Sequence, residues 1–319
     1  MPGLVFEDVH VTYPGGVRAV RGVSLEVASG RRVGVAGESG CGKSSVALAA
    51  LRLLPASAEV SGRILIDDED VAGMSWGRLR AVRWTGASIV FQGAMHALNP
   101  VRTVGHQIAE PLILHDKLSP KAAAGRVGGL LERVGLPGWR AGSFPHQLSG
   151  GQRQRVMIAM ALACRPGLII ADEATTALDV MIEAQVLRLL DQIVADDRIA
   201  LLMISHDVSV LSAWCDELAV MYAGRIVEHG PAKAVVQAPS HPYVRGLVGA
   251  LSPVGDVGAR LSPHGLAGRA PDPAGLPRGC AFRARCDVAV EECASLDVGL
   301  RSSGEGRVAA CVHVGGESS

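Results

Sequence analysis

Residues 37–44 read Gly37-Glu38-Ser39-Gly40-Cys41-Gly42-Lys43-Ser44 and match the phosphate-binding pattern G-x-x-x-x-G-K-S. Just before them, residues 32–36 form a short apolar run typical of a β-strand. Residues 45–54 after them are good helix formers, and Pro55 ends that run. Because the pattern requires a strand before the loop and a helix after it, this context favours a P-loop over a glycine turn that matches by chance.

The chemistry of such a loop depends on its glycines, its lysine and its serine. Glycines let the backbone wrap closely round a phosphate, so that successive N–H groups point at the anion. The N-terminus of the following helix adds partial positive charge at the same place. Lys43 is expected to reach the β- and γ-phosphates, and the hydroxyl of Ser44 is expected to bind Mg²⁺.

The overall composition limits the possible classes of protein. Lysine plus arginine and aspartate plus glutamate number 31 each in 319 residues, and this zero net charge argues against a nucleic-acid binder. Hydrophobic residues make up 48% of the chain, ample for a core, and the length allows one large domain with a small appendix or two modest domains. No apolar run is long enough to span a membrane, and the N-terminus shows no signal segment. We therefore expect a cytosolic chain whose seven cysteines do not form disulfides.

The N-terminal part has the pattern of β-structure. Residues 4–13 and 17–27 alternate apolar and polar side chains on either side of a glycine turn, which predicts an antiparallel segment. Tyr13 stands just before that turn, where it could stack on an adenine or be an ordinary strand tyrosine. Residues 61–68 are predicted to form a further strand.

Polar residues follow the buried strands predicted over 88–91, 168–173 and 199–204. Gln92 follows the first strand and His206 follows the third, whereas Asp172 and Glu173 end the second. Ligands collect at the carboxyl ends of strands in such sheets, and an aspartate followed by a glutamate fits a Mg²⁺ ligand next to a water-orienting base. The alternatives are that Asp172 and Glu173 are merely solvated charges at the end of a strand, and that His206 has a structural role.

Helical patterns occupy the middle of the chain. Residues 103–142 are predicted to be helical, with one apolar face. The segment Leu148-Ser149-Gly150-Gly151-Gln152 then opens a helix from Arg153 to about Cys164, with Ser149 as its N-cap. The two glycines expose backbone N–H groups and so suggest a second phosphate-binding surface, although alone they also fit a plain turn. A helix is also predicted over 180–196.

Taken in order, these residues resemble an ATP-binding cassette (ABC) ATPase. The motifs are the P-loop, Gln92, Leu148–Gln152, Asp172-Glu173, Ala177-Leu178-Asp179 and His206. The resemblance covers about residues 4–250 and implies an α/β fold: an ABC-type P-loop core, an antiparallel β subdomain and a helical signature subdomain around 93–160. Residues 251–319 are expected to form a Cys-rich C-terminal extension. The family pairs two cassettes head to tail, so that each ATP lies between one P-loop and the partner's signature motif.

The resemblance also assigns roles to residues. It implies that Asp172 supports Mg²⁺ with Ser44, and that Gln92 contacts the ion and the water. Glu173 would be the general base, His206 would brace the γ-phosphate, and Tyr13 would stack on adenine. The other implied nucleotide-binding residues are Gly37, Ser39, Gly40, Cys41, Gly42, Lys43 and Ser45. Ser149, Gly150, Gly151 and Gln152 would serve the partner's nucleotide, with Asp179 at the dimer seam. Ala174 stands where many members have proline, which bears on loop stiffness.

Three segments narrow the resemblance to the ATPase subunits of oligopeptide, dipeptide and nickel importers: Leu98–Pro111, His241–Arg245 and Gly279–Cys286. The resemblance implies ATP-driven import of short peptides from the cytoplasmic face of the membrane. The partners would be a second, related ATPase subunit (or a second copy), two transmembrane permeases and an extracytoplasmic binding protein. Nickel or metal-chelate import is the alternative within the class. A soluble ABC ATPase of DNA repair is the alternative outside it, and the lack of a heptad run before Leu148 disfavours it.

The C-terminal part contains four cysteines, Cys280, Cys286, Cys293 and Cys311, after an irregular connector predicted over 252–279. Four thiolates can hold a zinc ion or an iron–sulfur cluster, and the paired C-x₂₋₄-C spacing of structural zinc sites is absent. Some members that this chain resembles carry a [4Fe–4S] cluster on this tail. We therefore expect such a cluster, with bound zinc or free thiols as the alternatives.

Overall fold

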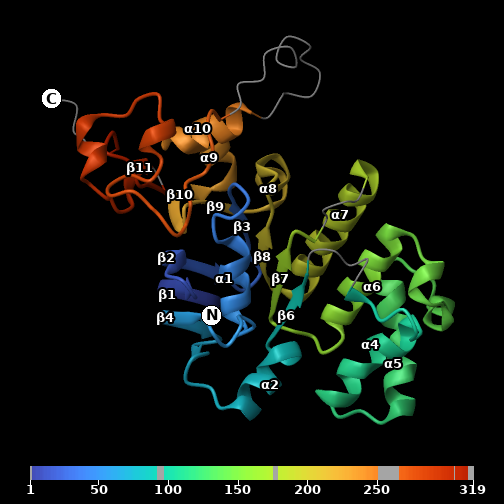
Figure 1. Ribbon diagram of the computed structural model, residues 1–319. Helices are drawn as coiled ribbons and strands as arrows, with labels where there is room; N and C mark the ends of the chain where they lie inside the picture. Colours follow the sequence, from blue (N-terminus) through green and yellow to red (C-terminus); the bar gives the residue numbers. More distant parts are fainter. Residues whose placement is uncertain (1, 92–96, 175–178, 251–265, 305, 315–319) are drawn as a thin grey trace. The chain divides into compact units, whose positions relative to one another are not determined.

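The computed structural model describes residues 2–91, 97–174, 179–250, 266–304 and 306–314 (Figure 1). Its contacts divide the chain into two compact units. The first unit contains Met1–Val5, Glu26–Arg32 and Ile64–Ile204, and the second contains Phe6–Leu25, Val33–Arg63 and Ser205–Ser319. In the described residues, no helix has the length and apolar character needed to cross a membrane.

The first unit is built on a parallel sheet of three strands in the order β6-β7-β8. The strands are β6 (Ala87–Val90), β7 (Leu168–Asp172) and β8 (Ala200–Ile204). Leu168 of β7 lies opposite Ala87 of β6 and Ala200 of β8. Every residue of β7 and β8 is buried, as expected for parallel strands whose two faces are both covered. The strands predicted from the apolar runs are confirmed to within one or two residues.

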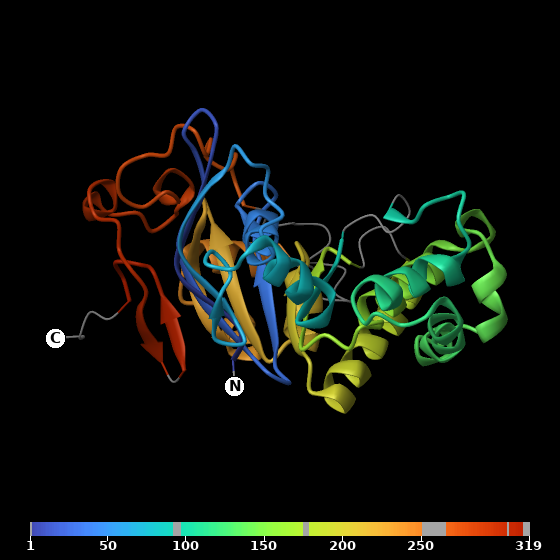
Figure 2. The same cartoon turned by 90° about the horizontal axis from the view of Figure 1, so that it is seen from below.

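The helices of the first unit are α2 (Trp76–Thr85), α4 (Val104–Leu114), α5 (Pro120–Arg133), α6 (Gly150–Leu162) and α7 (Val180–Asp197), with 3₁₀ turns η1 (Gly138–Gly142) and η2 (Pro145–Gln147). Figure 2 shows α4 to α6 in green. The helical region expected over 103–142 is thus divided into three pieces. Lys117 has a left-handed φ of 55°, and Ser119 caps α5 with Pro120 at its first position, so the chain restarts there.

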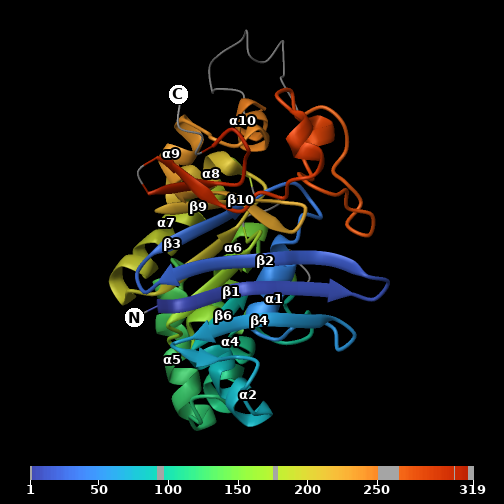
Figure 3. The same cartoon turned by 90° about the vertical axis from the view of Figure 1, so that its left-hand side faces the viewer.

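The N-terminal strands form a sheet in the order β2-β1-β4-β5 (Figure 3). They are β1 (Pro2–Tyr13), β2 (Val17–Ala28), β4 (Glu59–Ile66) and the short β5 (Glu69–Asp70). Only three residues join the neighbouring strands β1 and β2, and a connection that short requires an antiparallel pair. This confirms the β-structure predicted for the N-terminal part.

The second unit contains a mixed sheet. Strand β3 (Arg32–Ala36) runs parallel to β9 (Glu217–Tyr222), and β9 turns back into the antiparallel β10 (Arg225–Pro231). The C-terminal hairpin of β11 (Arg301–Gly304) and β12 (Arg307–Ala309) pairs antiparallel with β10 (Figure 2, red arrows). The helices are α1 (Lys43–Ala50), α8 (Val208–Trp214), α9 (Ala232–Gln237) and α10 (Pro242–Gly249), with 3₁₀ turns η3 (Arg283–Arg285) and η4 (Glu291–Ala294).

Helix α1 ends at Ala50, so the prediction that it continues to residue 54 is wrong. Arg52 has a left-handed φ of 48° and its N–H donates to the carbonyl oxygen of Ala49 at 3.0 Å. The N–H of Leu53 reaches back to the carbonyl oxygen of Leu48 at 2.8 Å. This pair of bonds is a Schellman motif, which satisfies the last carbonyl groups and stops the helix before Pro55.

Candidate active site

The P-loop connects β3 to α1 in the second unit, as predicted. Gly37 and Gly42 have φ values of 150° and 106°, which disfavour any side chain. A Cβ on Gly42 would lie 2.2 Å from the carbonyl oxygen of Ala19, and one on Gly37 would lie 2.3 Å from that of Met221. Glycine is therefore required at both positions because the loop passes directly against the main chain of β2 and β9.

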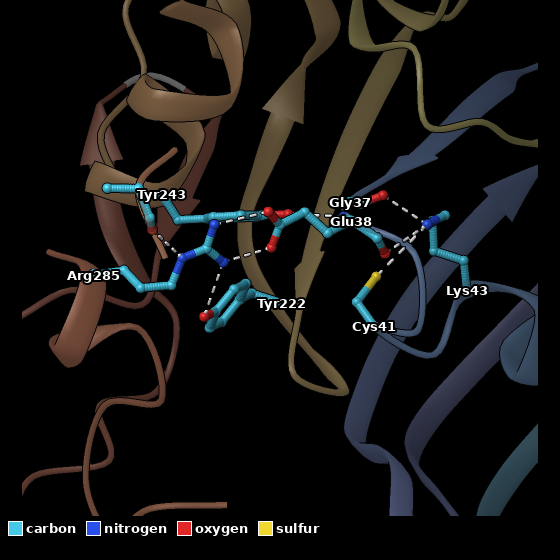
Figure 4. A network of polar contacts seen from close by, with 8 residues as sticks. Gly37, Glu38, Cys41, Lys43, Tyr222, Tyr243 and Arg285 are labelled. Carbon is cyan, nitrogen blue, oxygen red and sulfur yellow. Dashed lines mark hydrogen bonds and ion pairs between the residues drawn. The ribbon is translucent and has the colours of Figure 1, made fainter. Parts of the chain in front are cut away.

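Lys43 is buried at the start of α1. Its Nζ donates to the carbonyl oxygens of Gly37 at 2.6 Å and Glu38 at 3.0 Å, and lies 3.8 Å from the Sγ of Cys41 (Figure 4). Gly42, the N-cap of α1, supplies no side-chain hydrogen bond to the first N–H groups of the helix. A buried ammonium group beside a helix N-terminus without a side-chain cap is an arrangement suited to an anion such as phosphate.

Tyr13 contacts the helix that follows this loop, and Cys41 belongs to the loop itself. The hydroxyl groups of Tyr13 and Ser45 are hydrogen-bonded at 3.1 Å, which places Tyr13 against the first turn of α1. Its stacking on adenine stays a prediction. Burial raises the pKa of the Cys41 thiol, although the nearby ammonium group of Lys43 acts in the opposite direction. At neutral pH Cys41 is therefore a packed thiol inside the loop.

His206 lies near the strand that leads into the P-loop. The N–H of Ser205 donates to the carbonyl oxygen of Val35 in β3 at 3.2 Å, which puts the next residue, His206, close to the carboxyl end of that strand. The His206 side chain is exposed. Asp207 begins α8 by accepting the N–H of Ser209 at 2.8 Å. The predicted position of His206 after a strand is thus confirmed, and its contact with the γ-phosphate stays a prediction.

Asp172 and Glu173 come from the first unit, at the end of β7. Asp172 is buried, whereas Glu173 follows the strand with a left-handed φ of 47°. The N–H of Glu173 donates to the carbonyl oxygen of Ile204 in β8 at 2.9 Å, which holds this bend in place. A left-handed conformation costs about 1–2 kcal/mol for a residue with a side chain, and such strain is frequent at functional positions.

The signature residues begin α6 in the first unit. The side chain of Ser149 accepts the N–H of Gln152, and the Gln152 side chain accepts the N–H of Ser149, which forms a capping box. The helix starts at Gly150, three residues earlier than predicted. A Cβ on Gly151 would lie 2.3 Å from Cγ2 of Ile182 in α7. Asp179 caps α7 by accepting the N–H of Ile182 at 3.0 Å. Because Gly151 lies against Ile182, the starts of α6 and α7 lie side by side.

The structure thus groups the predicted residues by unit. The second unit brings together Tyr13, the P-loop and His206, whereas the first holds Asp172 with Glu173, and the signature residues with Asp179. Gln92 lies outside the described residues, as do residues 177 and 178.

The four C-terminal cysteines line a single pocket of about 50 Å³. Within it the N–H of Cys280 donates to the carbonyl oxygen of Cys293 at 2.9 Å. Burial raises the pKa of Cys280 and Cys286, and the other thiols of the set raise it further. Among the described residues, however, no group of three or more His, Cys, Asp or Glu side chains is arranged to hold a metal ion. The iron–sulfur prediction is therefore not confirmed, because thiols that share a pocket do not by themselves make a metal-binding group.

The structure also reveals contacts that the sequence analysis missed. Arg285, next to Cys286, forms an ion pair with Glu38 of the P-loop, with Nη1 2.7 Å from Oε2. The N–H of Glu38 donates to the hydroxyl group of Tyr243 at 2.9 Å. Arg285 and Tyr243 belong to two segments that resemble peptide-importer ATPases, but no local pattern indicates their common partner.

Comparisons with known proteins identify the family of this chain. The pattern of the family described as "ABC transporter" matches residues 20–176, and that of "Oligopeptide/dipeptide transporter, C-terminal region" matches residues 227–293. The dipeptide transport ATP-binding protein DppD of Bacillus subtilis is 45% identical over 290 residues, which cover 89% of this chain and 86% of that protein. The oligopeptide transport ATP-binding protein OppD of Salmonella typhimurium is 39% identical over 313 residues, 97% of this chain and 92% of that protein.

Solved structures give the same result for the fold. CbiO1 of Clostridium perfringens, part of the transporter complex cbiONQ, matches with a TM-score of 0.66 and 28% identity over 74% of this chain and 91% of that one. The ATP-binding cassette MJ0796, solved as a dimer bound to ADP and Pi, matches with a TM-score of 0.64 and 28% identity over 72% of this chain and 98% of that one. The P-loop geometry and these similarities lead to one conclusion: the chain belongs to the ABC transporter family and is an ATP- and Mg²⁺-using ATPase of that family.

Proposed function

We propose that this chain is the ATP-hydrolysing subunit of a membrane transporter that imports short peptides. The observation that carries the proposal is its similarity to dipeptide and oligopeptide transport ATP-binding proteins over 89% and 97% of its length. The match of its C-terminal region to that of oligopeptide/dipeptide transporters supports the same substrate class. The buried Lys43 in a glycine loop supports the ATP-binding part of the proposal.

Within this function, Lys43 binds the β- and γ-phosphate oxygens, and Glu173 accepts a proton from the attacking water. His206 braces the γ-phosphate, and Tyr13 stacks on adenine. The left-handed backbone of Glu173 supports its role, since strain of this kind is retained where function requires it. Magnesium fits the proposed donor set of Ser44, Asp172 and Gln92, because Mg²⁺ prefers oxygen ligands. When bound, it neutralises charge on the phosphates.

The signature residues serve the partner's nucleotide in this proposal. Ser149, Gly150, Gly151 and Gln152 would face a second cassette, with Asp179 at the seam between the two chains. The capping box and the close packing of Gly151 on Ile182 support the role, because they make the start of α6 rigid. We propose that the second cassette is a related but different chain. Two permeases and an extracytoplasmic binding protein complete the transporter, and the present chain lies on the cytoplasmic face of the membrane.

We propose that the chain is organised as a cassette over residues 1–250, with a helical subdomain at about 93–160, and an extension over residues 251–319. We also propose that Cys280, Cys286, Cys293 and Cys311 of this extension hold a [4Fe–4S] cluster. The proposal rests on the resemblance and on the presence of four thiols, because the described residues contain no group arranged to hold a metal ion. Metal analysis of anaerobically purified protein tests it: iron and sulfide with visible absorbance would support the cluster, and zinc without iron would overturn it.

The function is tested by ATP hydrolysis in the assembled transporter with its own binding protein, supplied first with short peptides and then with nickel chelates. Stimulation by peptides is expected. Stimulation by nickel chelates alone would replace peptide import by metal import and leave the residue roles unchanged. A transporter assembled with the Glu173→Gln variant is the control, because it removes the proposed base without altering substrate delivery.

A further inference from the structure

A charged contact joins the cysteine-containing C-terminal part to the P-loop within the second unit. Arg285 donates to both carboxylate oxygens of Glu38, through Nη1 to Oε2 at 2.7 Å and through Nη2 to Oε1 at 2.9 Å (Figure 4). The two residues are 247 positions apart in the chain. This fork-to-fork geometry is the strongest form of an arginine–carboxylate pair, because two parallel bonds fix both planes.

The guanidinium group of Arg285 is held by its surroundings. Its side chain is only 5% exposed, and its Nε donates to the carbonyl oxygen of Ala267 at 2.8 Å. It also packs beside an aromatic cluster, with Cζ 5.9 Å from the ring centre of Tyr222 and 5.8 Å from that of Phe282. A lysine could not reproduce these contacts, since it lacks the planar set of donors.

The N–H and the carbonyl oxygen of Glu38 also form hydrogen bonds. Its N–H donates to the hydroxyl group of Tyr243, which is fully buried against Tyr222 with ring centres 4.5 Å apart. Its carbonyl oxygen accepts a hydrogen bond from Nζ of Lys43 at 3.0 Å. A single P-loop residue thus connects Arg285 and Tyr243 on one side with the phosphate-binding lysine on the other.

We propose that Arg285 is a positioning residue for ATP binding, which holds the Glu38 side chain away from the phosphates and neutralises its charge. The inference rests on the phosphate-binding role proposed above for the P-loop. Without Arg285, the carboxylate of Glu38 would be an unpaired negative charge in a loop that must accept a triphosphate. It would repel the phosphates and compete with them for Lys43, so the affinity for ATP would fall while the proton-transfer machinery stayed intact.

The experiment measures ATP binding to the full-length chain and the KM and kcat of ATP hydrolysis by the assembled transporter. Arg285→Ala is expected to weaken ATP binding and raise KM by about tenfold, with kcat changed less than about twofold, because the half-buried carboxylate of Glu38 loses its partner. Arg285→Lys should lie between this variant and the wild type, since it keeps the charge and loses the fork.

Two further variants separate this mechanism from loss of structure. In a Glu38→Gln background, Arg285→Ala should change KM by about twofold or less, because no carboxylate is left unpaired. Arg283→Ala is the matched control, since Arg283 lies in the same 3₁₀ turn but donates to the carbonyl oxygen of Ala294 and not to the P-loop. Its KM should equal that of the wild type.

Three results would overturn the inference: an unchanged KM in Arg285→Ala, an equal rise in KM in both backgrounds, or an equal rise in Arg283→Ala. The inference fails separately from the underlying assignment of the P-loop. If Lys43→Ala still bound ATP as the wild type does, the assignment itself would be wrong. If Lys43→Ala lost binding and Arg285→Ala did not, only the positioning role would be rejected.

Discussion

The substitution Gly42→Ala tests whether the P-loop is held in place by its contact with the main chain of β2. Gly42 has a φ of 106°, so a methyl group there costs about 1–2 kcal/mol in backbone conformation alone. The new Cβ would also lie 2.2 Å from the carbonyl oxygen of Ala19, whereas ordinary contacts begin at 3.4 Å. The obstacle is main chain rather than a flexible side chain, so the loop must move by roughly 1 Å.

We expect Gly42→Ala to destabilise the chain by about 2–5 kcal/mol, the sum of the conformational cost and an overpacking cost of about 1–3 kcal/mol. A displacement of about 1 Å in a phosphate-binding loop should also weaken ATP binding, because the N–H groups no longer point at the phosphates. Chemical denaturation and fluorescent nucleotide binding measure the two effects.

The same loop offers a matched control in Gly40→Ala. Gly40 also has a positive φ, 80°, but a Cβ there would have no heavy atom within 4 Å. This variant should therefore cost only the conformational term of about 1–2 kcal/mol. Equal stability and equal ATP binding of Gly42→Ala and Gly40→Ala would refute the steric argument, because the two positions differ mainly in the contact with Ala19.

Three further predictions concern Glu173, the start of α6 and the start of α10. Glu173→Gln should abolish ATP turnover and leave ATP bound, and undiminished hydrolysis would exclude Glu173 as the base. Ser149→Ala should destabilise the chain by about 0.5–2 kcal/mol in denaturant, because it removes the N-cap of α6; Thr at this position should retain most of the stability. Burial lowers the pKa of His241 from 6.5 to about 4. As the pH falls, His241 therefore takes up a proton in the unfolded chain before it does so in the folded chain. The stability that comes from neutral His241 is complete above about pH 6.5 and is lost as the pH falls towards 4. His241→Asn, which can still cap α10, should flatten the pH dependence of the unfolding free energy in this window; an unchanged slope would contradict it.

The local features of this chain could be predicted from its sequence. The strand–loop–helix around Lys43, the carboxylates at the end of β7 and the Ser149 cap of α6 each depend on residues within about one helical turn or strand of one another. The ordered motifs also indicated the family, which the comparisons confirm. The predicted end of α1 was wrong. Within a run of good helix formers, no local sequence signal shows that Arg52 adopts a left-handed conformation instead of continuing the helix.

Other features were decided only by the tertiary structure. The pairing of Arg285 with Glu38, the contact of Tyr243 with the P-loop and the close approach of Gly42 to Ala19 join residues far apart in the chain. Periodicity reports which face of an element is buried, but not which distant backbone or side chain covers it. The sequence alone therefore determined the fold class, the family and the chemical groups of the candidate site. Only the tertiary structure shows which of those groups are contacted by Tyr243 and Arg285 of the C-terminal part, because such long-range contacts form only when the whole core packs.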